Sequence, residues 1–170
     1  MKNLIVILAF LIVFAYADTH QRNLIVDIND QILIKTFTET FTTDSIQDCG
    51  KPEDILHITY LDIAPDPPQR GQELSIDAAG YLTETVVEGS YIELTVKMGL
   101  IRLLQKKLDL CEQVEKVNKE CPLEKGEQTL QHTVELPKEI PPGKYTVDVH
   151  VYTPDRRPIA CLKATAFFRP

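Results

Sequence analysis

Six short segments with strand-like patterns constrain the fold of this chain most strongly. Each alternates apolar with polar residues or is rich in β-branched and aromatic side chains, which is typical of β-strands. They cover residues 55–63, 73–78, 91–98, 129–136, 144–152 and 160–168. Turn-forming prolines and glycines separate them. This spacing predicts an all-β sandwich, in which two sheets pack through their inner faces.

The stretch after Gly99 breaks the alternation. Four apolar residues crowd around the single charge of Arg102 in a segment that we expect to leave the sheet: Leu100, Ile101, Leu103 and Leu104. Residues 101–118 also carry a weak helical stripe. We therefore expect a loop with a turn or two of helix over 101–118.

The N-terminus has the features of a secretory signal. Lys2 precedes an apolar run over residues 4–17, and the run ends in the small-residue pattern Ala15-Tyr16-Ala17. A membrane span needs roughly 17 to 25 apolar residues, so a cleaved signal peptide over 1–17 is favoured over an uncleaved anchor. Residues 18–41 differ in character from the strand-rich remainder of the chain and are interpreted as a propeptide or an N-terminal arm. The folded domain is then expected over 42–170.

The four cysteines indicate disulfides in an oxidising compartment. They are Cys49, Cys111, Cys121 and Cys161, and three pairings are open to them. The closeness of Cys111 and Cys121 favours a short loop, which leaves Cys49 and Cys161 to join the two ends of the domain. None lies in a C-x-x-C arrangement and no histidines have zinc-site spacing, so we expect no metal site.

Composition and motifs argue against several functions. A formal net charge of -7 disfavours a sequence-independent grip on nucleic acid. None of the three serines lies in G-x-S-x-G, and no Walker or G-x-G-x-x-G pattern occurs, so we expect neither an enzyme nor a cofactor. His132 alternates in phase with Leu130, which predicts a core histidine rather than a catalytic or pH-sensing one. Asp62 and Asp66 flank a proline turn and are interpreted as turn residues rather than an acid/base pair.

The last strand has an unusual inner face. Leu162, Ala164, Ala166 and Phe168 lie on one side, so two small residues occupy its middle. A sandwich core is packed to crystal-like density, and empty space is costly. Either bulkier residues opposite fill the gap, or a cavity there holds an apolar ligand.

Several short motifs, taken together, resemble the ML (lipid-recognition) family. They are Asp48-Cys49-Gly50, Lys97-Met98-Gly99, Cys121-Pro122-Leu123, Leu136-Pro137 and Cys161 on the final strand. The resemblance spans roughly 48–168 and is strongest to the fungal phosphatidylglycerol/phosphatidylinositol transfer proteins, with the Niemann-Pick type C soluble sterol carrier as another relative. Animal members with a third disulfide carry it near residues 64–70, where this chain has prolines, which favours the fungal branch.

The resemblance implies an immunoglobulin-like sandwich of about seven strands with an apolar cavity between the sheets. It also implies the pairings Cys49–Cys161 and Cys111–Cys121. The implied pocket walls are Leu74, Ile76, Leu94, Val96, Met98, Val134, Leu136, Ile140, Tyr145, Val147, Val149, Leu162 and Ala164. An apolar lip at the mouth of the pocket matches Leu100, Ile101, Leu103 and Leu104.

The function implied by the resemblance is lipid transfer. Ile101, Arg102, Lys106 and Lys107 would then touch a membrane, the three cations facing anionic headgroups; the alternative is that the lip leucines cap the sandwich and the cations are a solvated face. The expected ligand is phosphatidylinositol, phosphatidylglycerol or a sterol, carried by a monomer in the secretory pathway, in the vacuolar or endolysosomal lumen or outside the cell. The alternative function is a secreted module that presents a lipid to a protein partner without transferring it.

Overall fold

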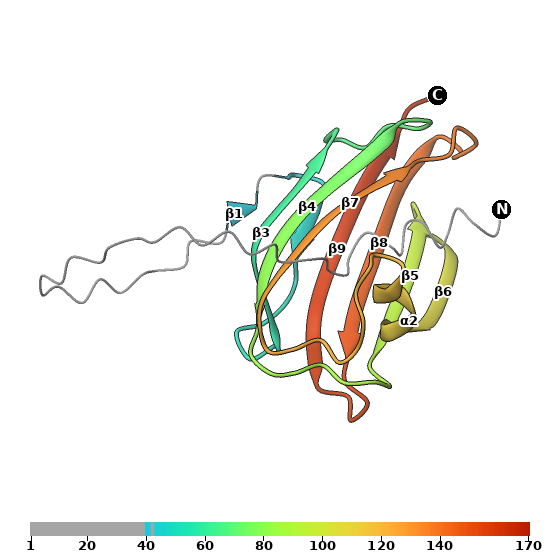
Figure 1. The fold of residues 1–170 in the computed structure, drawn as a ribbon. Helices are drawn as coiled ribbons and strands as arrows, with labels where there is room; N and C mark the ends of the chain where they lie inside the picture. Colours follow the sequence, from blue (N-terminus) through green and yellow to red (C-terminus); the bar gives the residue numbers. More distant parts are fainter. Residues whose placement is uncertain (1–39, 42) are drawn as a thin grey trace, which may run out of the picture.

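The protein is a two-layer β-sandwich (Figure 1). The computed structural model describes residues 40–41 and 43–170. The four-stranded sheet has the order β1 (Thr40–Phe41), β3 (Leu56–Ala64), β4 (Glu73–Leu82), β7 (Gly126–Glu135). The five-stranded sheet has the order β2 (Ile46–Asp48), β9 (Pro158–Phe168), β8 (Gly143–Tyr152), β5 (Tyr91–Met98), β6 (Ile101–Asp109). The predicted fold class is confirmed: β3 to β9 are the seven long strands, and β1 and β2 add two short ones.

The core lies between the two inner faces, as the alternating sequence patterns require. On β8, Tyr145, Val147, Val149 and Val151 are buried and the residues between them are half-buried. All neighbouring strands run antiparallel except β1 and β3, which are parallel. Apolar side chains from both sheets therefore form one continuous core.

The expectation of a loop over residues 101–109 is wrong, because this segment forms strand β6. Gly99 and Leu100 make a two-residue turn between β5 and β6, and Gly99 supplies the positive φ of 57° that such a turn needs at its first position. A bulge comes next: Val96 pairs with Leu104 and Lys97 with Arg102, which leaves Leu103 as the extra residue. The bulge shifts the phase of the side chains and hides the alternation.

The expected helical turns occur after β6, in α2 (Leu110–Glu115). Asp109 caps this helix, since its carboxylate accepts a hydrogen bond from the Glu112 N–H at 3.1 Å. The buried side chains of Leu110 and Val114 attach α2 to β5 and β6. Among residues 40–41 and 43–170, no helix has the length and apolar character needed to cross a bilayer.

Both predicted disulfides are present. Cys49 pairs with Cys161 across 112 residues of sequence, and Cys111 pairs with Cys121 across 10. The first joins the end of β2 to β9, where the Cys49 N–H also donates to the Cys161 carbonyl. The predicted signal peptide over 1–17 and residues 18–39 of the predicted arm lie outside the described residues. The last two residues of that arm form β1.

The strand connections gather at two ends of the sandwich. One end, here called the hairpin end, carries the Gly99–Leu100 turn, the loop over residues 65–72, the loop over residues 136–142 and the end of β9. The other, the helix end, carries α2 and the turn over residues 153–157. This division matters because the space between the sheets is incompletely filled at the hairpin end.

Candidate functional site

An apolar cavity lies between the sheets at the hairpin end. Its volume is about 30 Å³, room for about one water molecule. Apart from Ser45 and Thr165 its lining is apolar, and it comes from both sheets and from the loop that joins β3 to β4. The lining residues are Ser45, Ile46, Ile63, Pro68, Leu74, Leu136, Tyr145, Val147, Ala164, Thr165, Ala166 and Phe168.

The cavity is where the two alanines of β9 face the core. Ala164 pairs with Ile46 of β2 and Val147 of β8, and Ala166 pairs with Tyr145. The opposite sheet contributes Ile63, and all of these larger neighbours are buried. Neighbouring side chains thus fill most of the space above the alanines and leave a small void. The bulkier neighbours expected by the first interpretation are present, and the small void leaves an apolar ligand at this face as a prediction.

An aromatic pair forms part of the cavity wall. The rings of Tyr145 and Phe168 meet edge to face with centroids 5.5 Å apart. The Tyr145 hydroxyl donates to the Pro141 carbonyl at 3.1 Å. Burial raises the pKa of this hydroxyl, and the nearby Arg70 guanidinium partly offsets the rise. The tyrosine is thus held as a neutral donor beside an otherwise apolar void.

A polar clamp beside the cavity ties the two sheets together. Asp66, in the β3–β4 loop, accepts hydrogen bonds from the Thr43 hydroxyl at 2.7 Å, from the Asp44 N–H at 3.0 Å and from the Ser45 hydroxyl. Burial opposes ionisation of Asp66, but these hydrogen bonds outweigh it and lower the pKa of its carboxyl. Asp66 is therefore a structural loop residue, whereas Asp62 lies on β3 rather than in the turn.

The residues of the predicted lip lie on the β5–β6 hairpin. Leu100 is 102% exposed at the turn, Ile101 is 62% exposed and Leu103 is 46% exposed. Leu104 is half-buried against the core. The first three therefore do not cap the sandwich, and they form an exposed apolar tip at the same end as the cavity. The tip and the cavity are separated by β5 and part of β8.

The three predicted cations do not converge on one point. Lys107 places its Nζ 3.5 Å from the centre of the Tyr91 ring. Arg102 donates to the Gln105 side chain at 2.8 Å. The cross-strand partner of Lys106 is Leu94, whose side chain faces the core, so Lys106 lies on the core-facing side of β6 and Lys107 on the opposite side. All three are exposed, and they surround the hairpin as a diffuse positive fringe.

The structure brings five of the predicted wall residues to the cavity: Leu74, Leu136, Tyr145, Val147 and Ala164. The remaining predicted residues lie in the core away from it, fully or partly buried: Ile76, Leu94, Val96, Met98, Val134, Ile140, Val149 and Leu162. They pack around the cavity's neighbours rather than against the void. The predicted wall residues therefore describe the inner faces of the whole sandwich, and the cavity lies at only one end of them.

The lining residues that the sequence analysis missed differ in how much signal the sequence carries for them. Ile63 belongs to a predicted strand, and its burial follows from the alternation on β3. Ile46 and Ser45 lie just before Cys49, ahead of the predicted strands, and β2 is only three residues long. Pro68 belongs to a turn whose path across the cavity has no sequence signal. The pairing of β2 with β9 brings Ile46 and Ser45 to the site.

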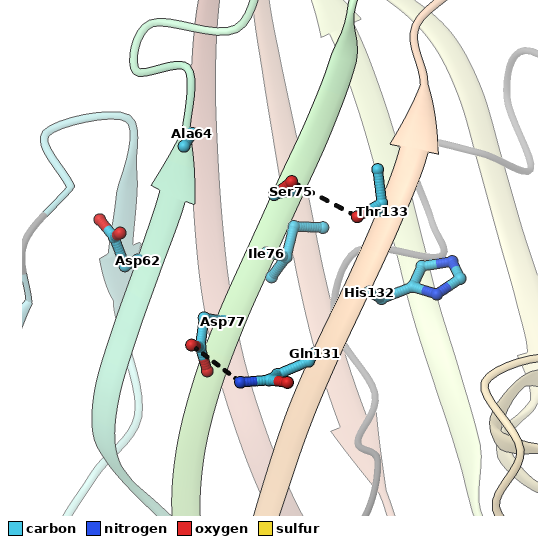
Figure 2. A pocket seen from close by; sticks show the side chains of 8 residues that line it. All are labelled: Asp62, Ala64, Ser75, Ile76, Asp77, Gln131, His132 and Thr133. Atoms are coloured by element: carbon cyan, nitrogen blue, oxygen red, sulfur yellow. Dashed lines mark hydrogen bonds between the residues drawn. The ribbon is translucent and has the colours of Figure 1, made fainter.

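A second hollow, of about 300 Å³, lies on the outer face of the four-stranded sheet (Figure 2). Its side chains are mainly polar and bond to one another: Gln131 donates to Asp77 at 3.2 Å, and the Ser75 and Thr133 hydroxyls are 3.3 Å apart. His132 points away from these bonded pairs (Figure 2). It lies on the inner side of β7, in phase with Leu130, as predicted. It is only half-buried there, so it is not the fully buried core histidine that the sequence predicts. The polar side chains of this hollow are explained by hydrogen bonds between neighbouring strands on a solvated face, so they need no ligand.

Comparisons with known proteins place the chain in a family. The family model described as the ML domain matches residues 43–168. A Neurospora crassa protein named phosphatidylglycerol/phosphatidylinositol transfer protein is 41% identical over 162 residues, which cover 95% of this chain and 90% of that one. A Pyricularia oryzae protein of the same name is 51% identical over 116 residues, covering 68% of this chain and 65% of that one. The chain belongs to the ML-domain family.

A solved structure supports the same fold. The Niemann-Pick type C2 protein of the Japanese carpenter ant superposes with a TM-score of 0.51 at 16% identity, covering 73% of this chain and 98% of that one. The alignments to the two fungal relatives cover between 65% and 90% of their length. The ML-domain match and the two fungal relatives confirm the predicted family.

Proposed function

We propose that this protein is a lipid-transfer protein that binds a phospholipid or a sterol between its sheets and moves it between membranes. The observation that carries the proposal is the apolar cavity above Ala164 and Ala166, lined by both sheets. The fungal relatives, whose names specify phosphatidylglycerol/phosphatidylinositol transfer, support it. The protein would act by binding alone, without a catalytic step.

The size of the cavity sets a condition on this function. Ligand pockets have volumes of about 300–1,000 Å³, whereas this cavity has about 30 Å³. The sheets must therefore separate at the hairpin end when lipid enters. Each methylene shielded from water is worth roughly 0.8 kcal/mol, so a 16-carbon chain held between the sheets is about 13 kcal/mol more stable than the same chain in water. A chain that arrives from a bilayer is already shielded, so the expanded cavity must be as apolar as the bilayer interior to accept it. Lipid binding and core expansion are thus one coupled event.

The exposed hairpin tip supports a membrane-facing orientation. Leu100, Ile101 and Leu103 would insert among lipid headgroups, and Arg102, Lys106 and Lys107 would add attraction to anionic lipids. Each cation near such a surface is worth about 1 kcal/mol. Because the cavity lies at the same end, a lipid could pass into it without crossing bulk water. This contact would be transient and made by a monomer.

The chemistry of the chain supports a compartment of the secretory pathway. Two disulfides are typical of proteins that fold in an oxidising compartment. Together with the signal-like N-terminus, they favour the secretory pathway, with a vacuolar or endolysosomal lumen or the cell exterior as the final location.

The test combines two measurements on protein secreted by a host cell. Native mass spectrometry, followed by extraction, is expected to find one phospholipid or sterol bound per chain. A vesicle assay with no other protein present is expected to show labelled lipid moving from donor to acceptor vesicles. Bound lipid without transfer would favour a module that presents lipid to a partner. Protein that stays lipid-free after incubation with mixed vesicles would refute both functions.

A further inference from the structure

A cleft with both charged and apolar walls adjoins the apolar cavity at the hairpin end. It has a volume of about 450 Å³ and is lined by Pro67, Pro68, Gln69, Arg70, Phe167, Phe168 and Arg169; we call it the mouth cleft. Pro68 and Phe168 line both the mouth cleft and the cavity, so these two side chains form their common wall. A ligand that separates this wall would occupy both spaces at once.

The guanidinium of Arg70 is fixed in position at this cleft. Its Nη1 donates to the Ile140 carbonyl at 3.0 Å, and its Nη2 donates to the Arg169 carbonyl at 2.5 Å. A guanidinium has five N–H donors in a planar fork. Two carbonyls thus orient Arg70 and leave further donors of the fork for another partner. The side chain is half-buried, which strengthens its field compared with a fully solvated cation.

No carboxylate within residues 43–170 lies at salt-bridge distance from Arg70 or Arg169. Asp66, four residues before Arg70 in the sequence, is engaged by Thr43 and Ser45 instead. Glu73, three residues after Arg70, is the exposed first residue of β4. Two like charges therefore share one cleft in a chain whose formal net charge is -7. An anion bound between them would relieve their repulsion, and arginine matches the geometry of phosphate oxygens through paired hydrogen bonds.

We propose that the mouth cleft binds the phosphate of an anionic phospholipid headgroup through Arg70 and Arg169, while the acyl chains enter the adjoining cavity. The proposal rests on the lipid-transfer function and specifies its ligand class. Gln69 supplies an amide at the same cleft for a hydroxyl-bearing headgroup. A headgroup that ends in a quaternary ammonium is disfavoured there, because its positive charge would meet the two arginines. A sterol would use the cavity and leave the cleft empty.

The test measures lipid choice with the full chain and two variants, Arg70→Gln and Arg169→Gln. Vesicles containing equal amounts of phosphatidylinositol and phosphatidylcholine are offered, and the bound lipids are quantified. We expect the wild-type ratio to favour phosphatidylinositol and each variant to lower it severalfold. Both lipids carry the phosphate, so the ratio falls because each variant removes one of the two positive charges that disfavour the choline ammonium. Arg169 is exposed, so its variant keeps the test valid if the Arg70 variant fails to fold.

The matched control is Arg156→Gln, which removes the same charge from an exposed arginine in the turn at the helix end. This control should keep the wild-type ratio, and sterol uptake should be unchanged in all three variants. An unchanged ratio in both cleft variants, with lipid still bound, overturns the headgroup site and leaves lipid transfer intact. Wild-type protein that takes up no lipid overturns lipid transfer, and the headgroup site with it.

Free glycerol phosphate distinguishes a lipid headgroup from a soluble phosphate. It has the phosphate without the acyl chains, so we expect it to bind at least a thousandfold more weakly than the lipid, since it loses the burial of several methylenes. Equal affinity for glycerol phosphate and phosphatidylinositol would overturn the assignment to a lipid.

Discussion

Substituting valine for Ala164 should change stability and lipid affinity in opposite directions. The added methyl groups enter a void of about 30 Å³. At about 24 cal/mol per Å³, filling it would stabilise the lipid-free protein by at most about 0.7 kcal/mol. The same methyl groups would occupy space needed by roughly two methylenes of a bound chain. The loss is about 1.6 kcal/mol, or about 15-fold in affinity.

Urea unfolding of lipid-free protein measures the first effect, and lipid extraction from vesicles measures the second. Ala160→Val is the matched control, because Ala160 faces the core on the same strand toward the helix end and does not line the cavity. Overpacking there should cost about 1–3 kcal/mol of stability and leave lipid affinity unchanged. The reasoning is refuted if Ala164→Val loses stability as the control does and keeps wild-type affinity, since the void would then be an ordinary packing defect.

Three further perturbations probe the hairpin, the clamp and the long disulfide. Leu100→Glu should slow transfer between vesicles severalfold at unchanged stability, because Leu100 is fully exposed, whereas Val87→Glu, an exposed valine at the helix end, should not; equal rates would exclude the hairpin from membrane contact. Asp66→Asn should lower the free energy of unfolding at pH 7 by about 1 kcal/mol. Because the pKa of Asp66 is lowered on folding, its contribution is present above the ordinary value of 3.8 and is lost as pH falls through the lower folded value. Wild type and variant should therefore converge in acid, and a constant difference across pH would contradict the clamp. Changing Cys49 and Cys161 to serine should lower the free energy of unfolding by up to about 4.7 kcal/mol, since the disulfide closes a loop spanning 112 residues; a loss no larger than that from removing the 10-residue disulfide would count against this entropic account.

The fold is largely predictable because burial on one face leaves a period of two in the sequence. The β8 pattern of Tyr145 and Val147 with polar neighbours is the clearest case. β6 escapes prediction because it is an edge strand with few buried residues and because the bulge at Leu103 changes its phase. Gly99 is the available signal: a glycine followed by one residue between two extended runs is typical of a tight hairpin.

The cavity is only partly predictable, since a void depends on what two separate sheets leave unfilled. Ala164 indicates its floor from the sequence alone. Its other walls depend on the short strand that carries Ile46 and on the loop that carries Pro68. The mouth cleft likewise combines residues that are 99 positions apart, Arg70 and Arg169. Such long-range neighbours leave no local pattern to read.

Strand β6 also affects self-association. It is the last strand of its sheet among the described residues, so one side of its backbone is open to pairing with another extended chain. A flat apolar edge of this kind promotes aggregation. Here the bulge at Leu103 interrupts the edge, and Lys106 and Lys107 place charge along it. The hairpin therefore exposes apolar side chains at its tip while strand addition by a second copy is opposed along its edge.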